Sequence, residues 1–152
     1  MTAAAILCLG NRWHGDDGFG HHVFRLLHDE GALPATVELV DAGVAGLNAL
    51  PWLDGCANVV VVDAVRVGAP VGTVQRLAAR ELAPPGGELS LHELGLTSLL
   101  AAGAAIRGNA PEVVVIGAQV GRIHAFAEAL SAPLRAAVPV AAAMAAREVG
   151  AA

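Results

Sequence analysis

The sequence contains no lysine, so its positive charge comes from nine arginines, set against fourteen aspartates and glutamates. The formal net charge is −5, and the arginines form no basic cluster in the chain. Proteins that follow a phosphate backbone need such a cluster, because much of their affinity comes from cations at phosphates. We therefore expect no nucleic-acid partner.

Cysteine is also scarce, with only Cys8 and Cys56 in the chain. Each lies in or beside an apolar run, and the two do not form a C-x-x-C pair. Neither a zinc knuckle nor a disulfide framework is indicated by this spacing. We expect both cysteines to be core residues.

Long hydrophobic runs are missing, although 55% of the residues are hydrophobic. The longest uncharged stretch, Leu94 to Ile106, is well short of the roughly 18 to 20 residues that span a bilayer. The N-terminus has no basic n-region, and no A-x-A cleavage site follows its first apolar run. We expect a cytoplasmic protein without membrane insertion.

Apolar strand-like runs alternate with helical patterns along the 152 residues, which fit a single domain, 1–152. This rhythm predicts an α/β fold: a three-layer α/β/α sandwich with a mostly parallel twisted sheet of about five strands, one of them antiparallel. The expected strands are 3–9, 36–41, 58–65, 71–77 and 113–118, with 71–77 as the antiparallel edge. The expected helices run from Phe19 to Gly31, from 47 to 53, from Ser90 to Gly103 and from 131 to 149.

A glycine-rich turn, GNRWHGDDGFG at residues 10–20, follows the first strand. It lies where many α/β proteins bind phosphate, but Asp16 and Asp17 would repel that ligand, and the glycine spacing differs from G-x-G-x-x-G. A helix N-cap explains one aspartate. The second could be a solvated carboxylate that complements the helix dipole.

Other polar residues suggest a different role for this turn. If the first and third strands are neighbours, Asp17 and Asp63 face one crevice at the carboxyl ends of the strands. His92, in the first turn of a helix that begins with the S-x-x-E capping box at Ser90, could reach the same crevice. Two carboxylates and an imidazole suit a divalent ion of the first transition row.

Each of these residues also has an ordinary explanation. Asp63 could be a turn former, and His92 could be solvated. The other polar and aromatic candidates suggest less: we expect His21, His22 and His28 on the solvent side of the first helix, and Trp13 and Trp52 in core or rim packing.

The segments around these residues resemble the hydrogenase maturation endopeptidases, which trim the C-terminus of the large subunit of [NiFe] hydrogenases. The turn matches the family pattern G-N-x-x-x-x-D-[DE]-G-x-G. Further matches follow in the family's order over nearly the whole chain: Asp41 to Leu47 resembles D-G-G-T-x-G, Val61 to Val65 the second aspartate strand, Ser90 to Leu96 the S-x-H-x-x-x-L element, and Ile116 to Val120 the I-G-[IV]-Q-P strand end.

The resemblance implies that Asp17, Asp63 and His92 form both the nickel-contacting and the catalytic site, while Asp16 caps the helix or supports the site. It implies that nickel arrives with the large-subunit precursor, with zinc or cadmium able to substitute in vitro. Cleavage would fall after a His or Arg behind the precursor's last metal-binding cysteine motif. We also expect a monomer.

Asp41 and Gly43 are the substrate-binding residues that the resemblance implies. Three neighbouring positions depart from the family pattern. Ala42 and Val44 replace a glycine and a threonine where the family reads its particular hydrogenase, and Val120 replaces the usual proline.

No serine or cysteine nucleophile with a histidine base is visible, because the capping box already uses Ser90. Nickel held by the three residues could polarise the scissile carbonyl or activate a water. A carboxylate could serve as general base. Two alternatives stay open: a peptidyl-tRNA-hydrolase-like enzyme, and a non-catalytic protein that binds nickel or the hydrogenase precursor.

Overall fold

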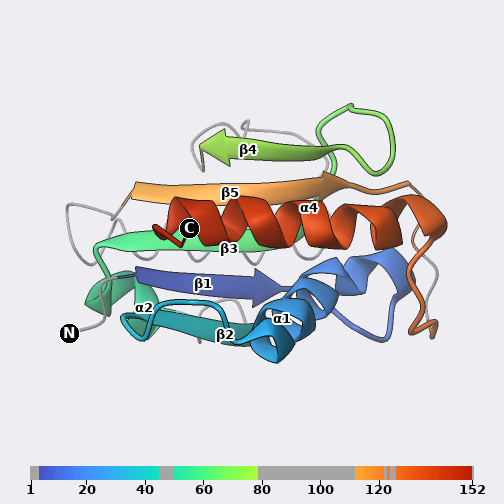
Figure 1. Cartoon of the computed structure of the whole chain (residues 1–152). Helices are drawn as coiled ribbons and strands as arrows, with labels where there is room; N and C mark the ends of the chain where they lie inside the picture. The colour runs from blue at the N-terminus through green and yellow to red at the C-terminus, as the bar shows by residue number, and fades with distance from the viewer. Residues whose placement is uncertain (1–3, 45–49, 79–111, 122, 124–125, 152) are drawn as a thin grey trace.

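The computed structural model describes residues 4–44, 50–78, 112–121, 123 and 126–151 (Figure 1). Five strands form one sheet in the order β2-β1-β3-β5-β4. Its strands are β1 (Ala4–Leu9), β2 (Val37–Gly43), β3 (Asn58–Val65), β4 (Val74–Ala78) and β5 (Glu112–Gln119). The first, second, third and fifth strands pair in parallel, and β4 pairs antiparallel with β5 at one edge. The expected sheet, with its antiparallel edge strand, is confirmed.

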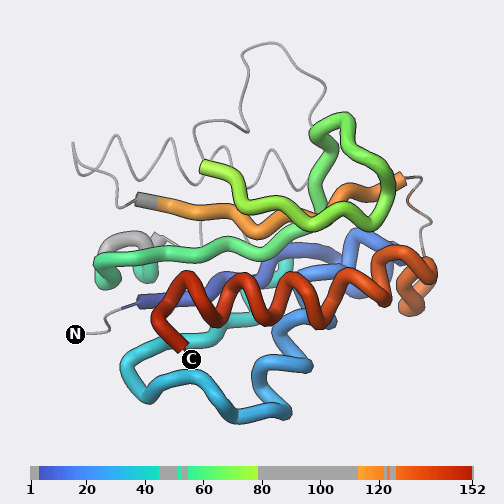
Figure 2. Tube along the Cα trace, turned by 45° about the horizontal axis from the view of Figure 1, so that its top comes forward, coloured from blue at the N-terminus to red at the C-terminus, as the bar shows by residue number. Residues whose placement is uncertain are grey.

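Two long helices cover one face of the sheet, as Figures 1 and 2 show from different directions. They are α1 (Phe19–Glu30) and α4 (Ala132–Glu148), which pack against each other. A 3-10 turn, η1 (Gly15–Gly18), precedes α1, and a short helix, α2 (Leu50–Gly55), leads to β3. The helix expected from Ser90 lies outside the described residues.

The inner strand β1, between β2 and β3, is buried along its whole length, which explains its uninterrupted apolar sequence. Its side chains alternate between two core clusters. Ile6 and Cys8 belong to the cluster beneath α1 and α4, and Leu7 and Leu9 belong to the cluster on the opposite face, which Trp52 borders. Cys8 and Cys56 are buried free thiols, as expected for core residues.

Most expected element ends lie within two residues of the observed ones. The two larger differences have local causes. The antiparallel strand begins at Val74 rather than Val71, because a turn comes first in which Thr73 N–H donates to Pro70 O at 3.1 Å. The short helix is observed from Leu50, and residues 45–49 before it lie outside the described part. No helix among the described residues is both long and apolar enough to cross a bilayer.

The first turn of α1 lies directly against the sheet. A Cβ at Gly20 would be 2.1 Å from Leu9 O in β1 and 2.9 Å from Val62 O in β3. These are backbone atoms, so no side-chain rotation could relieve the contact. Glycine at this position therefore lets the helix begin close to the ends of both strands, where the preceding turn carries Asp16 and Asp17.

Replacing Gly20 with alanine should therefore destabilise the fold by about 3 kcal/mol or more, because overpacking is forced against fixed backbone. Urea unfolding of the Gly20→Ala variant would measure the change. Gly55→Ala is the matched control, since a Cβ there meets nothing within 4 Å. Equal stability of the two variants would show that the helix does not approach the sheet this closely.

Candidate active site

The carboxyl ends of the central strands meet at one edge of the sheet. Within β1, Cys8 lies between Asp41 of β2 and Val62 of β3 in the strand register. The chain leaves β1 toward β2 on one side and reaches β3 on the other, so this is the topological switch point where open α/β sheets bind ligands. Asp17 and Asp63 both lie at this edge, as expected from the sequence.

The turn after β1 is fixed at both ends by backbone hydrogen bonds. Gly10 N–H donates to Gly43 O of β2 at 2.9 Å, and Gly15 N–H donates to Ala127 O. Gly10 itself has a φ of +136°, and a Cβ there would lie 2.2 Å from Asp17 O, so the turn closes tightly on itself. These contacts set the position of η1 and of its two aspartates.

Asp16 is buried, with 7% of its surface exposed, and it supports a helix distant in sequence. Ser131, the N-cap of α4, donates its N–H to Asp16 Oδ1 at 2.7 Å and its hydroxyl to Oδ2 at 2.7 Å. Asp16 makes no capping hydrogen bond to α1, whose N-cap is Gly18. Of the two expected roles of Asp16, capping its own helix is therefore wrong, because both of its oxygens hold the start of α4; support of the site stays a prediction.

Asp17 and Asp63 are the other two buried carboxylates of this edge, 8% and 1% exposed. Asp63 Oδ1 accepts a hydrogen bond from Ala64 N–H at 2.8 Å, and η1 packs against β3. His92 lies outside the described residues, so the metal site formed by the three residues remains a prediction. Two buried carboxylates from separate segments of the chain are nevertheless at the predicted edge.

Gln119, also buried, organises the segment that follows Asp63. Its Oε1 accepts hydrogen bonds from Val67 N–H at 2.8 Å and Ala69 N–H at 3.3 Å, and its Nε2 donates to Val120 O at 2.9 Å. Val120 N–H in turn donates to Val65 O at 3.1 Å. Proline has no N–H, so the valine at this position adds a hydrogen bond that the usual proline could not make.

His21 is a site residue that the sequence reasoning missed. We expected it on the solvent side of α1, but its side chain is only 14% exposed, and its Nδ1 lies 2.7 Å from Asp41 Oδ2. His22 is half-buried and hydrogen-bonds Glu128 O through Nε2, and burial lowers its pKa. Only His28 is exposed as expected, stacked on Phe24.

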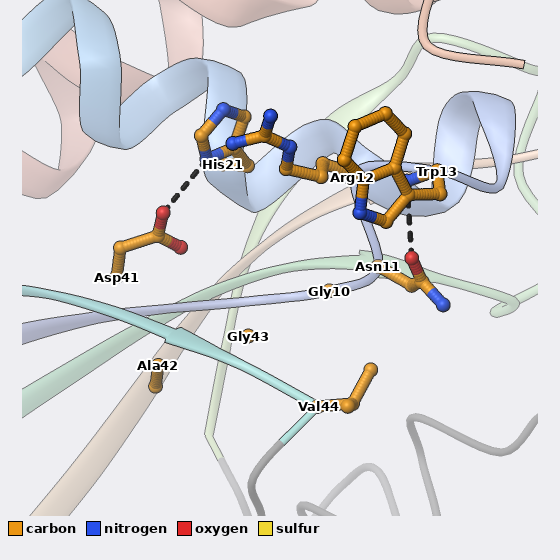
Figure 3. A pocket seen from close by; sticks show the side chains of 9 residues that line it. All are labelled: Gly10, Asn11, Arg12, Trp13, His21, Asp41, Ala42, Gly43 and Val44. Atoms are coloured by element: carbon orange, nitrogen blue, oxygen red, sulfur yellow. Dashed lines mark hydrogen bonds and ion pairs between the residues drawn. The ribbon is translucent and has the colours of Figure 1, made fainter.

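An open cleft of about 380 Å³ lies beside the pair of His21 and Asp41, between the turn after β1 and the end of β2 (Figure 3). Asp41 and Gly43, the expected substrate-binding residues, both line it, as do Ala42 and Val44. Trp13, which we expected in core or rim packing, is half exposed at this cleft. The cleft thus joins residues from two adjoining strand ends.

Cys8 lies beneath the site and is fully buried. Burial raises the pKa of its thiol far above the ordinary range, and the negative charges of Asp41 and Asp63 raise this pKa further. Burial also raises the pKa of Cys56. Because the thiolate is the nucleophilic form, neither cysteine has the environment of a cysteine protease.

Sequence comparison relates the chain to proteins of hydrogenase maturation. The family model HycI, "Hydrogenase maturation protease", matches residues 21–148. Hydrogenase expression/formation protein HoxM of Azotobacter vinelandii is 34% identical over 141 residues, which cover 90% of this chain and 68% of that protein. HupD of Rhodobacter capsulatus is 31% identical over 95% of this chain and 70% of its own length.

Structural comparison also relates the chain to a protein of hydrogenase maturation. The hydrogenase maturating endopeptidase HybD from E. coli superposes with a TM-score of 0.82 and 25% sequence identity, over 97% of this chain and 94% of that one. The similarity therefore extends over the whole fold, including the sheet edge that carries Asp17 and Asp63.

Replacing Asp16 with alanine should leave the N–H of Ser131 without its partner and cost about 1 to 3 kcal/mol of unfolding free energy. Ser131→Ala removes only the hydroxyl and should cost less. Asp29→Ala, at an exposed position of α1, is the control and should change stability by no more than about 0.5 kcal/mol. A double-mutant cycle without coupling between Asp16 and Ser131 would contradict the role assigned to Asp16.

The native protein should react slowly with iodoacetamide at pH 8, because both cysteines are buried and their raised pKa values keep the thiols protonated. Mass spectrometry would count the modified thiols with and without urea. Rapid modification of Cys8 in the folded protein would contradict the burial described here.

Proposed function

Since this chain belongs to the hydrogenase maturation protease family, we propose that it removes a C-terminal peptide from the nickel-loaded precursor of a [NiFe]-hydrogenase large subunit. The main support is that Asp17 and Asp63 are two buried carboxylates from separate segments, with the η1 turn that carries Asp17 packed against β3, which carries Asp63. Because the chain belongs to this family, we do not propose the alternative of a peptidyl-tRNA-hydrolase-like enzyme.

In this proposal, Asp17, Asp63 and His92 contact the nickel that the precursor brings. Asp16 is less suited to this role, because Ser131 already donates to both of its oxygens. Three protein ligands cannot fill the shell of a divalent ion that prefers four to six, so cysteines of the precursor and water would complete it. The metal would then fix which peptide bond lies over the site.

Asp41 and Gly43 would contact the precursor in the cleft beside the metal site. Gly43 O is already used by Gly10 N–H, and Asp41 Oδ2 by His21. Both residues line the cleft, so the precursor would reach them there. This placement supports substrate contacts at the mouth of the site rather than at the scissile bond.

Two chemical routes remain for the hydrolysis. The substrate's nickel can polarise the scissile carbonyl, or it can lower the pKa of a bound water that then attacks it. In either route a carboxylate of the site would accept the proton of the attacking water. The buried, protonated thiol of Cys8 supports a mechanism without a cysteine nucleophile.

The decisive experiment mixes wild type and His92→Ala separately with nickel-loaded and nickel-free precursor. Only wild type with the nickel-loaded precursor should release the C-terminal peptide, detected by mass spectrometry. Efficient cleavage of the nickel-free precursor would contradict recognition through the metal. Tight binding of the loaded precursor by the wild type without cleavage would instead identify a non-catalytic precursor-binding protein.

Asp17→Asn tests the predicted metal contact from the other side. It should abolish peptide release and weaken zinc or cadmium binding in a titration, because a neutral amide is a poorer ligand for these ions than a carboxylate. Asp29→Asn, on the exposed end of α1, is the control and should process normally. Unchanged metal binding and processing by Asp17→Asn would remove Asp17 from the site.

A further inference from the structure

The cleft beside the site contains two charged groups whose surroundings differ. The carboxylate of Asp41 is held by His21, 2.7 Å from its Nδ1. The guanidinium of Arg12 lies 4.5 Å above the centre of the Trp13 ring, and within the described part of the chain no carboxylate pairs with it. Of the two, Arg12 is the charge left for a ligand (Figure 3).

Trp13 restrains the orientation of this cation. Arginine stacks on aromatic faces through its planar guanidinium, which leaves the N–H groups at the rim of the plane available. The Trp13 backbone is held in turn, because its N–H donates to Asn11 Oδ1 at 3.0 Å. The pair is therefore a partly preorganised donor group at an exposed edge of the cleft.

The geometry fits a carboxylate better than a neutral group. A guanidinium offers two parallel N–H donors that match the two oxygens of an Asp or Glu side chain, and such charge-assisted bonds are stronger than neutral ones. The chain has a formal net charge of −5 and therefore repels acidic segments of a partner overall. An arginine at the site without a carboxylate partner among the described residues would attract such a segment locally.

We propose that Arg12, oriented by Trp13, binds an Asp or Glu side chain of the hydrogenase precursor and thereby helps to select it. The proposal rests on the function proposed above. It assigns the selection to Arg12 and Trp13, at two positions that the turn pattern G-N-x-x-x-x-D-[DE]-G-x-G leaves unspecified, in addition to Asp41 and Gly43. Because the contact is remote from the reacting bond, it should contribute to substrate binding and leave the chemical step unchanged.

Steady-state processing of the nickel-loaded precursor by Arg12→Gln tests this proposal. KM should rise about five- to tenfold at low salt, as for a lost charge-assisted hydrogen bond, while kcat should stay within about twofold. The KM of the wild type should rise with added sodium chloride more steeply than that of the variant, because salt screens the exposed contact. Arg12→Lys should recover part of the loss.

Arg25→Gln is the matched control, since Arg25 is an exposed arginine on α1 outside the cleft. It should change neither KM nor the salt dependence. Thermal unfolding of all variants should coincide with that of the wild type, which separates lost binding from lost folding.

The partner side is tested by neutralising the acidic residues near the cleavage site of the precursor in groups, Asp to Asn and Glu to Gln. One group should raise KM for the wild type and have no further effect on Arg12→Gln. When the acidic residues of this group are replaced by lysine instead, the precursor should be processed better by Arg12→Glu than by the wild type.

Two results would overturn the carboxylate contact and leave the proposed function intact. In the first, the KM of Arg12→Gln at low salt equals that of the wild type. In the second, the effects of the enzyme and precursor substitutions on KM are additive. If the wild type does not cut the loaded precursor at all, the proposed function fails instead. In that case the dissociation constants of the same enzyme and precursor variants test the contact, and equal constants for wild type and Arg12→Gln would overturn it.

Discussion

The site depends on the parallel pairing of β1 between β2 and β3. Parallel strands end at the same edge of a sheet, so the segments that follow β1 and β3 and the last residues of β2 are brought together whatever their distance in the chain. The short apolar runs of β1 (Ala4–Leu9) and of Val59 to Val62 in β3 make this pairing possible, because each strand is covered on both faces. Asp17, Asp41 and Asp63 reach one edge as a consequence.

Close packing then restricts the turn that carries Asp16 and Asp17. Gly20 lets α1 begin against the backbone of β1 and β3, and the two oxygens of Asp16 hold the N-cap of α4. The turn is thus tied to both long helices as well as to the sheet. If Asp17 contacts metal as proposed, a turn held in this way would need little reordering, which favours precise placement of a substrate bond.

The electrostatics of the neighbouring cleft follow from two side-chain contacts, His21 with Asp41 and Arg12 with Trp13. Asp41 faces the side of the sheet covered by α1, where His21 meets it, whereas Arg12 stacks on Trp13 without a carboxylate among the described residues. The departures Ala42 and Val44 line the same cleft. Two of the three residues that differ from the family pattern thus lie in the cleft proposed to contact the protein substrate, whereas the third, Val120, is buried.

The sequence by itself determined the order along the chain of the described strands and helices, the antiparallel edge and the family, because these follow from apolar periodicity, turn residues and spaced motifs that are local in the chain. Only the tertiary structure decided which side chains face each other. Asp16 looks like an N-cap locally, but it meets Ser131, and His21 and His22 are adjacent on one helix, so periodicity alone could not assign His21 to Asp41. Such contacts join residues far apart in sequence, and their geometry is set by how helices and strands pack.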